Sequence, residues 1–236
     1  MPMLAFVTGG TGFVGSNLVA ALTNRGIGVR VLRRPTSSIA GLDGLEYESC
    51  VGDVLDSVDT LAAAMAGCTW VFHTAAISDY WRYRGRNQLY RTNVEGTRNV
   101  LAAAIRAGVE RLVFTSSIAA LGVPAPGRQL NEADRFNLRP RRFPYGHSKH
   151  LAECELRRAV AAGLPAVAVN PAVVIGPRDV NRISSAMIVE AARGRLRFAA
   201  PGGTNFVAAV DVAQGHIAAA ERGRVGERYI LAGENL

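Results

Sequence analysis

The 236-residue chain is poor in cysteine, has no long apolar run and contains a single lysine. Its three cysteines, Cys50, Cys68 and Cys154, form no CxxC pair, and its four histidines lack metal-ligand spacing. Neither a disulfide framework nor a zinc site is therefore expected. No apolar run reaches roughly 18 residues and no signal peptide precedes the first strand, so we expect neither a membrane span nor secretion. The prediction is a cytoplasmic protein that binds no metal.

The chain also lacks a block of like charges, although its net charge is +8 from 27 basic and 19 acidic residues. Arginines are spread along it without interleaved aromatic residues. This pattern disfavours nucleic-acid binding and favours a modest attraction for phosphorylated ligands. Apolar residues make up 49% of the chain, which indicates a well-packed globular protein. Every basic residue except Lys149 is arginine.

Short apolar runs alternate with helical patterns over the first three quarters of the chain. The runs interpreted as buried strands lie at residues 4–7, 29–32, 46–51, 70–72, 112–114 and 166–169. This alternation predicts an α/β fold with a Rossmann-type doubly wound parallel sheet over residues 1–177. After Pro177 the alternation weakens. Helices at 183–192 and 212–221 and strands at 205–210 and 228–231 predict a small, apparently truncated substrate lobe over residues 178–236.

Glycines at positions 9, 12 and 15 directly follow the first strand and precede a helical pattern. Without a Cβ atom the turn can be tight, and a pyrophosphate can approach the backbone. The following helix offers unpaired N–H groups and the positive end of its dipole to phosphate. We therefore predict that residues 8–15 bind a dinucleotide, with an ordinary glycine-rich turn as the alternative.

Charged residues after the second and third strands bear on the choice of cofactor. Arg33 and Arg34 stand where NAD-binding proteins of this fold usually have an acidic residue. Two guanidinium groups suit a 2′-phosphate, so we expect NADP, with NAD as the second choice. The alternative is a pair of surface arginines in an arginine-rich protein. Asp53, just beyond the third strand, could accept a hydrogen bond from an adenine amino group or cap the next helix.

Small and hydroxyl-bearing residues follow the fourth and fifth strands. Residues 73–76 (His-Thr-Ala-Ala) leave room for a ligand beside the sheet, and we interpret His73 as a structural histidine. A hydroxyl in residues 115–117 (Thr-Ser-Ser) could polarise a substrate oxygen or cap a turn. The polar and aromatic segment 78–88 lacks a clear period, which predicts a loop that could line the substrate mouth. A long helix is expected over residues 93–107.

Tyr145 and Lys149 are four residues apart, on one face of the helix predicted to begin at Tyr145. A phenol titrates at about pH 10 when unperturbed, and a nearby ammonium favours the phenolate. We therefore expect Lys149 to lower the pKa of Tyr145 toward neutral pH, which would suit the phenol to proton transfer. The alternative is an ordinary surface pair. The position of the single lysine at this spacing favours the functional interpretation.

Seven motifs, in order along the chain, resemble the extended short-chain dehydrogenase/reductase family, also called the NAD-dependent epimerase/dehydratase family. They are TGGTGFVG (8–15), GD (52–53), HTAA (73–76), TNVEGTRN (92–99), FTSS (114–117), YGHSK (145–149) and NPAVVIGP (170–177). The resemblance is strongest to the dihydroflavonol-reductase-like branch. The chain departs from the family in lacking the acidic residue typical of NAD binding after the second strand. It is also shorter than is usual in the family.

The resemblance implies a role for each matching residue. Tyr145 would be the general acid/base, Lys149 would lower its pKa and bind the nicotinamide ribose, and Ser117 would hold the substrate oxygen. The helices after Asn93 and Tyr145 would form a homodimer. With the two arginines included, the residues expected to bind the cofactor are Gly9, Thr11, Gly12, Phe13, Val14, Gly15, Arg33, Arg34, Asp53, Val54, Ala75, Ala76, Thr115, Tyr145, Lys149, Pro171, Val173 and Val174.

Three functions fit these residues. The first is an NAD(P)-dependent reductase or dehydrogenase that transfers a hydride to or from a carbonyl or hydroxyl carbon of a small molecule. The second is a nucleotide-sugar epimerase or dehydratase with tightly bound NAD(P), for which Arg178 and Arg182 could meet a diphosphate. The third, a non-catalytic nucleotide sensor, is disfavoured because such proteins usually lose the tyrosine or the lysine. No particular substrate is predicted.

Overall fold

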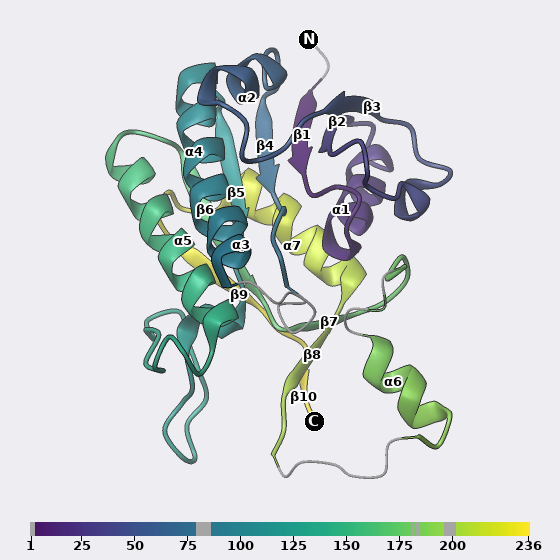
Figure 1. Ribbon diagram of the computed structural model, residues 1–236, viewed down its shortest axis with the longest axis vertical. Coiled ribbons are helices and arrows are strands. Elements are labelled where there is room, and N and C mark those ends of the chain that lie inside the picture. The colour runs from purple at the N-terminus through teal and green to yellow at the C-terminus, as the bar shows by residue number, and fades with distance from the viewer. Residues whose placement is uncertain (1–2, 79–85, 181, 183–184, 196–201) are drawn as a thin grey trace.

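A seven-stranded parallel sheet forms the centre of the computed structural model, which describes residues 3–78, 86–180, 182, 185–195 and 202–236 (Figure 1). The strand order is β3-β2-β1-β4-β5-β6-β9. The strands are β1 (Leu4–Thr8), β2 (Gly28–Arg33), β3 (Glu48–Val51), β4 (Trp70–His73), β5 (Arg111–Thr115), β6 (Ala166–Pro171) and β9 (Arg228–Leu231). Because the order reverses between β1 and β4, a ligand-binding crevice is expected at their carboxyl ends. The predicted fold class is confirmed.

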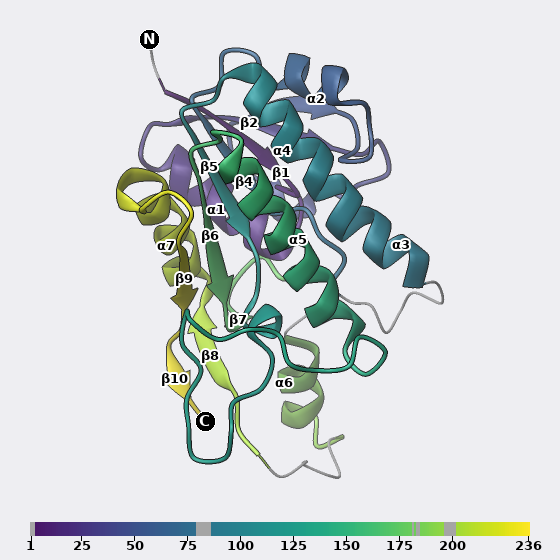
Figure 2. The same ribbon diagram turned by 90° about the vertical axis from the view of Figure 1, so that its left-hand side faces the viewer.

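Helices cover both faces of the sheet. On one face lie α2, α4 and α5, the last two side by side (Figure 2), and on the other α1 packs against α7. Successive strand residues point to opposite faces, so Phe6 is buried against the first layer and Val7 against the second. The helical elements of these layers are α1 (Phe13–Thr23), η1 (Ala40–Leu42), α2 (Val58–Ala64), α4 (Gly96–Ala107), η3 (Ile118–Leu121), α5 (Pro144–Ala161) and α7 (Ala209–Arg222). None of the described helices has both the length and the apolar character needed to cross a membrane.

Local sequence signals set the helix ends near the sheet edge. The Ser57 hydroxyl accepts a hydrogen bond from the Thr60 backbone N–H at 3.2 Å and caps α2. Gly108 ends α4 with a left-handed φ of 65°. Pro144 lies in the first turn of α5, where its missing N–H would have no helical partner. As a result α5 begins directly before Tyr145.

The helix that leads into α4 begins earlier than the sequence predicted. α3 (Arg86–Tyr90) continues through a π-helical turn, η2 (Arg91–Glu95), into α4. The predicted loop 78–88 is therefore wrong from Arg86 onward. The sequence from Arg86 onward shows little apolar periodicity, although the Leu89 side chain is buried in the core. Residues 79–85 of the predicted loop lie outside the described part of the chain.

The part of the chain after β6 contributes strands to two different sheets. β7 (Val173–Ile175), β8 (Asn205–Ala208) and β10 (Glu234–Asn235) form a second sheet below the main one, near α6 (Ser185–Ala192) (Figure 1). By contrast, α7 packs on the main sheet and β9 is its last strand. The predicted strand 205–210 stops at Ala208 because α7 begins at the next residue. A division into two domains at residue 177 stays a prediction.

Candidate active site

A cavity of about 950 Å³ runs along the carboxyl ends of the central strands of the main sheet. Every catalytic and cofactor-binding residue predicted from the sequence lies in its lining, from Gly9 after β1 to Val174 in β7. These residues come together because the carboxyl ends of parallel strands meet at one edge of a sheet. Their location agrees with the expectation, whereas the role of each one stays a prediction.

The glycine turn between β1 and α1 presents backbone atoms to the cavity. Gly9 has a left-handed φ of +67°, and a Cβ atom there would lie 2.6 Å from the backbone nitrogen of Ala75. A Cβ atom at Gly15 would lie 2.2 Å from the carbonyl oxygen of Gly9. Side chains are therefore excluded, and the first turn of α1 carries no acidic residue. This cradle fits a pyrophosphate bound by backbone N–H groups.

Charged side chains occupy the end of the cavity beside β2 and β3. Arg33 is half-buried, and its Nε donates a hydrogen bond to the Ser49 hydroxyl at 2.7 Å, whereas Arg34 is exposed. The Asp53 carboxylate accepts a hydrogen bond from the Leu55 backbone N–H at 3.0 Å. Asp53 therefore supports the turn before α2 and also faces the cavity.

Hydroxyl residues beside the arginines were missed in the sequence. Thr36, Ser37 and Ser38 follow Arg34 after a single proline and line the same end of the cavity. A run of three hydroxyls after two guanidinium groups was the available signal, because both kinds of group donate hydrogen bonds to phosphate oxygens. Together they make this end of the cavity suitable for an anionic group.

At the other end of the cavity, Ser117, Tyr145 and Lys149 converge. The Tyr145 hydroxyl is hydrogen-bonded to Ser117. Lys149 is only 2% exposed, its ammonium donates a hydrogen bond to the Thr115 carbonyl at 2.8 Å, and it lies 5.1 Å from the centre of the Phe114 ring. Two elements therefore build this group: α5 carries the phenol and the ammonium, and the end of β5 carries their partners.

Burial dominates the titration of both α5 residues. It raises the pKa of Tyr145 to about 12, against the opposite effect of the hydrogen bond with Ser117. It lowers the pKa of Lys149 to about 7, against the opposite effect of the negative charge on Glu153. The expected lowering of the Tyr145 pKa is therefore wrong for this structure. Spacing alone could not reveal that both groups leave water, which penalises the phenolate as well as the ammonium.

His73 is the structural histidine that the sequence suggested. Its ring is fully buried and hydrogen-bonded to the hydroxyls of Thr8, at 2.7 Å, and Thr97, at 2.9 Å. Burial, followed by the charge of Lys149, lowers its pKa to about 3, so the ring is neutral at physiological pH. Among the described residues, no group of His, Cys, Asp and Glu is arranged to hold a metal ion.

Asn93 ties two walls of the site together, a role that sequence reasoning did not assign. Its side-chain oxygen accepts a hydrogen bond from the Ile77 backbone N–H at 2.8 Å. Its amide donates to the Ile77 carbonyl and to the Ser148 hydroxyl, both at 3.0 Å. Asn93 thus connects the segment after β4 to the residue preceding Lys149. Its position in the π-helical turn η2 could not be read from the motif.

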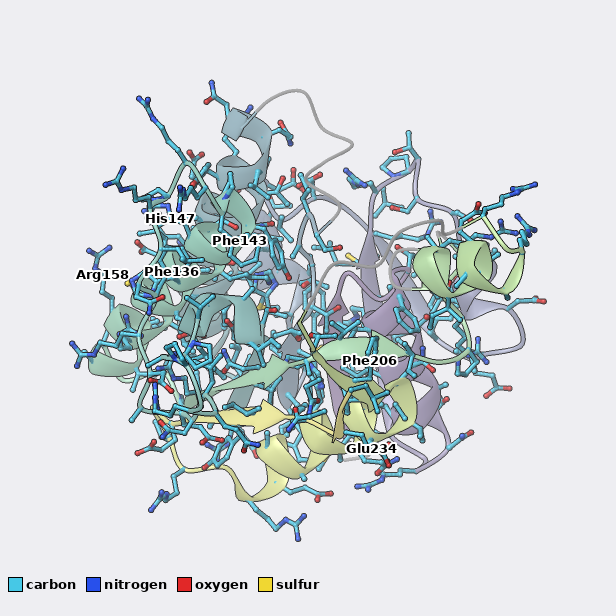
Figure 3. The ribbon with its side chains drawn as sticks, turned by 90° about the horizontal axis from the view of Figure 1, so that it is seen from below. Phe136, Phe143, His147, Arg158, Phe206 and Glu234 are labelled. Atoms are coloured by element: carbon cyan, nitrogen blue, oxygen red, sulfur yellow. The ribbon has the colours of Figure 1, made fainter. Side chains whose placement is uncertain are left out.

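Aromatic rings lie where the long loop before α5 meets that helix. The Phe136 ring stacks on His150, at 5.7 Å between ring centres, and lies tilted against His147 at 5.6 Å. Phe143 meets Tyr145 edge to face at 6.4 Å and lines the cavity. Figure 3 shows Phe136, Phe143 and His147 gathered at this end of the helix. An apolar ring therefore stands directly next to the Tyr145 phenol.

The two arginines suggested for a diphosphate are placed differently from one another. The Arg178 guanidinium donates to the Gly41 carbonyl at 2.7 Å, so it holds the segment after β2. Arg182 is exposed. Neither belongs to the lining of the cavity.

A parallel sheet with a side-chain-free turn at its switch point, and a tyrosine and a buried lysine on the following wall, defines a nicotinamide-dinucleotide enzyme. The sequence model of the NAD dependent epimerase/dehydratase family matches residues 5–232. The chain belongs to this family, and it is an NAD(P)-dependent enzyme of the extended short-chain dehydrogenase/reductase type. The expectation of an enzyme is confirmed.

Known proteins are similar to this chain over most of its length. It is 41% identical over 98% of its length to a protein of Synechocystis sp. assigned as a dihydroflavonol 4-reductase, covering 68% of that protein. It is 37% identical to sterol demethylase protein B of Methylococcus capsulatus, over 99% of this chain and 70% of that one. The crystal structure of DesIV, a dTDP-glucose 4,6-dehydratase of Streptomyces venezuelae with NAD and TYD bound, aligns with a TM-score of 0.88 and 26% identity, over 99% of this chain and 77% of that one. The chain is thus shorter than these relatives.

Proposed function

We propose that the protein is an NADP(H)-dependent reductase or dehydrogenase that acts on a carbonyl or hydroxyl carbon of a small or medium-sized hydroxy/keto compound. The observation that carries this proposal is the hydrogen bond between Ser117 and Tyr145 beside the buried Lys149, at one end of a cavity with a phosphate cradle. A proton donor and a second hydroxyl thereby point to one place, where a substrate oxygen can accept from both.

Each side chain has a distinct task in this proposal. The Tyr145 hydroxyl gives its proton to the substrate oxygen during reduction and takes it back during oxidation. The Ser117 hydroxyl holds that oxygen in place, and the Lys149 ammonium stabilises the phenolate that remains. With its pKa at about 12, Tyr145 retains its proton at neutral pH, which suits a general acid. The nicotinamide cofactor, when bound, supplies or accepts the hydride.

NADP is proposed over NAD because of the end of the cavity beside β2. Arg33, Arg34 and the hydroxyls of residues 36–38 line this end of the cavity together, and such groups suit a 2′-phosphate. Guanidinium groups bind phosphate oxygens in pairs of hydrogen bonds, whereas a carboxylate that would bind the NAD ribose is missing after β2.

An apolar ring ketone is the substrate class that we propose. Ile77, Phe143 and Val173 line the cavity together with Tyr145, so an apolar ring can pack there. The names of the relatives from Synechocystis sp. and Methylococcus capsulatus refer to a dihydroflavonol and a sterol, which are ring compounds. The alternative is a nucleotide-sugar epimerase or dehydratase, but Arg178, which was suggested for the diphosphate, bonds the Gly41 carbonyl instead.

The purified enzyme, assayed for retained cofactor and then for turnover, tests this function. We expect it to lose its cofactor during purification and to oxidise added NADPH with ketones such as a dihydroflavonol or a 3-ketosteroid. Controls are UDP-glucose and dTDP-glucose, which should cause no change in NADPH absorbance. Retention of one NAD(H) per chain, together with conversion of a sugar nucleotide without net NADPH oxidation, would instead establish the epimerase or dehydratase alternative.

We also propose a homodimer through the outer faces of α4 and α5, which lie side by side on one face of the sheet (Figure 2). Ile105 on α4 is 42% exposed, so an apolar side chain is available at this surface. Light scattering of the purified protein should give the mass of two chains, and a monomer that remains active would contradict it. The cytoplasmic location stays a prediction.

A further inference from the structure

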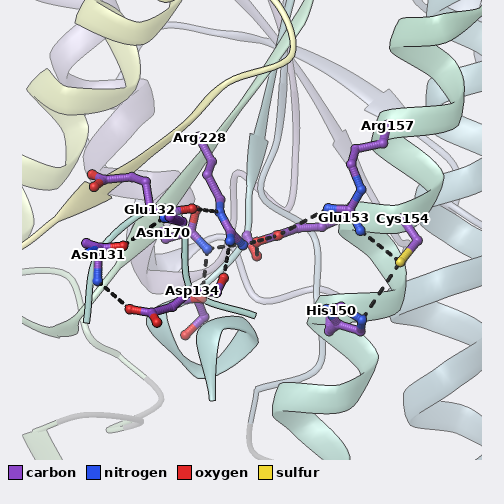
Figure 4. A network of polar contacts seen from close by, with 12 residues as sticks. Asn131, Glu132, Asp134, His150, Glu153, Cys154, Arg157, Asn170 and Arg228 are labelled. Atoms are coloured by element: carbon purple, nitrogen blue, oxygen red, sulfur yellow. Dashed lines mark hydrogen bonds and ion pairs between the residues drawn. The ribbon is translucent and has the colours of Figure 1, made fainter. Parts of the chain in front are cut away.

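A buried carboxylate lies one helical turn beyond Lys149. Glu153 on α5 is 2% exposed. Its Oε1 accepts hydrogen bonds from the Ser116 hydroxyl at 2.6 Å and from the Asn170 side-chain amide at 2.8 Å. Its Oε2 accepts from the Arg228 guanidinium at 2.8 Å (Figure 4). The acid is therefore bonded to the ends of β5 and β6 and to the start of β9.

The same contacts reach the groups proposed for proton transfer. The Asn170 amide donates a second hydrogen bond to the Ser117 carbonyl at 2.9 Å. Ser116, bonded to Glu153, lies between Ser117 and Thr115, whose carbonyl accepts from Lys149. Glu153 thus fixes the short segment that carries the partners of both Tyr145 and Lys149.

Arg228 extends the network to the loop before α5. Its guanidinium donates to the carbonyls of Glu132, at 2.8 Å, and Asp134 (Figure 4). The Glu132 carboxylate accepts from the Ile230 backbone N–H at 3.0 Å. Glu153 also faces Arg157, at 3.8 Å on its own helix. Two arginines therefore lie within ion-pair distance of the buried Glu153 carboxylate.

The charge of Glu153 also acts on the pKa of Lys149. His73 of β4 is neutral, and so is His216 of α7, which is bonded to Thr115 and whose pKa burial lowers to about 4. Tyr145 retains its proton at neutral pH. Arg98 of α4 is paired with Glu155. The polar side chains that β6 and η2 contribute to this part of α5 are the neutral amides of Asn170, bonded to Glu153, and Asn93, bonded to Ser148. Glu153 is the described carboxylate whose charge raises the pKa of Lys149.

We propose that Glu153 is a positioning residue with two linked tasks: its carboxylate anchors the Ser116–Ser117 segment, and its negative charge favours the ammonium form of the buried Lys149. Burial alone favours the neutral amine, and a nearby anion offsets that cost. This inference rests on the proposed function for the importance of Lys149 in turnover, but the state of charge of Lys149 can be measured independently.

The single lysine makes a direct measurement possible. In protein labelled with [¹³C]lysine, the side-chain signal belongs to Lys149 alone, so its pH titration reports one pKa. In Glu153→Gln we expect the titration midpoint to move to lower pH. A matched control is Glu155→Gln: this acid is on the same helix, is 9% exposed and is bonded to Arg98 and Arg158 in place of Ser116 and Asn170. The midpoint should not change in the control.

A conservative variant separates the charge from the anchor. Glu153→Asp keeps the carboxylate but is one methylene too short to keep the Ser116 hydrogen bond. The Lys149 midpoint should stay near that of the wild type, while kcat with a working ketone falls by roughly 10- to 100-fold, as expected for misplaced reacting groups. A Glu153→Asp midpoint that moves as far as that of Glu153→Gln would overturn the role of the charge, and an unchanged kcat would overturn the role of the anchor.

An unmoved midpoint in folded Glu153→Gln, or an equal move in Glu155→Gln, would overturn the proposal. If Glu153→Gln does not fold, Glu153→Gln/Arg228→Gln replaces the ion pair by two amides, and the same downward move of the midpoint is expected. Because the titration needs no turnover, a moved midpoint in a protein that reduces no ketone would support the inference on Glu153 while the proposed function fails.

Discussion

At one end of the cavity Lys149 is 2% exposed and hydrogen-bonded to a strand carbonyl, whereas at the other end Arg34 is exposed to solvent. Burial shifts the pKa of Tyr145 to about 12 and that of Lys149 to about 7. The end of the cavity that carries the arginines lies at the carboxyl end of β2 and is also lined by the hydroxyls of residues 36–38. One cavity thus combines a buried end, held by hydrogen bonds, with a solvent-exposed end that carries charged side chains.

The difference reflects what each end is proposed to do. Proton transfer needs groups held in fixed positions with shifted pKa values, and only burial among satisfied hydrogen bonds provides both. Recognition of a phosphate needs charge within reach, and exposed charges give this at low cost, although salt screens them. We therefore expect substitutions at the buried end to have large effects and those at the exposed end to have small, salt-dependent ones.

The largest effect is expected at the buried end from Tyr145→Phe. Removal of the phenol oxygen deletes the general acid, so kcat should fall by about 10²- to 10⁴-fold or more, while the Kd of NADPH stays within a few-fold. Stopped-flow measurement of NADPH oxidation and fluorescence titration of NADPH separate the two. The control is Tyr90→Phe, which removes a hydroxyl bonded to His147 outside the cavity lining. Wild-type turnover in Tyr145→Phe would refute the assignment.

The same contrast explains what could be predicted from the sequence. Arg34 was found because the strand ends of a parallel sheet share one edge, and Tyr145 was found from its helical spacing to Lys149. Glu153 and Arg228 are 75 positions apart, and their contact depends on β9 returning to the main sheet. Weak alternation after residue 177 gave no signal for that return. The same lack of period hid the helical start at Arg86.

A smaller effect, on stability, is expected from Lys149→Met. The pKa of Lys149 is about 7 in the folded protein and about 10.4 in an unfolded chain. Below pH 7 both states carry the charge, and the folded state bears the full cost of burying it. Between about pH 7 and 10 the unfolded state binds more protons, so wild-type stability rises with pH relative to the variant.

Lys149→Met should therefore be more stable than the wild type at pH 6, by on the order of a few kcal/mol, and this advantage should shrink as the pH rises through 7 toward 10. Urea unfolding of both proteins at a series of pH values measures it, and the difference between them cancels the titrations that Lys149 does not influence. Two stability curves that stay parallel from pH 6 to 10 would show that Lys149 titrates normally in the folded protein.

The smallest effect is expected at the exposed end, from Arg34→Ala. Loss of one guanidinium should weaken NADPH binding by about tenfold, or about 1.4 kcal/mol, and leave NADH binding unchanged, because only NADPH carries the 2′-phosphate. The loss should diminish at high salt, since exposed charges are screened. Arg222→Ala, an exposed arginine on α7, is the control for net charge. If the binding of NADPH and of NADH weakens equally, Arg34 supports the local fold at this end of the cavity and does not select the cofactor. The contrast between the two ends of the cavity would then rest on burial alone.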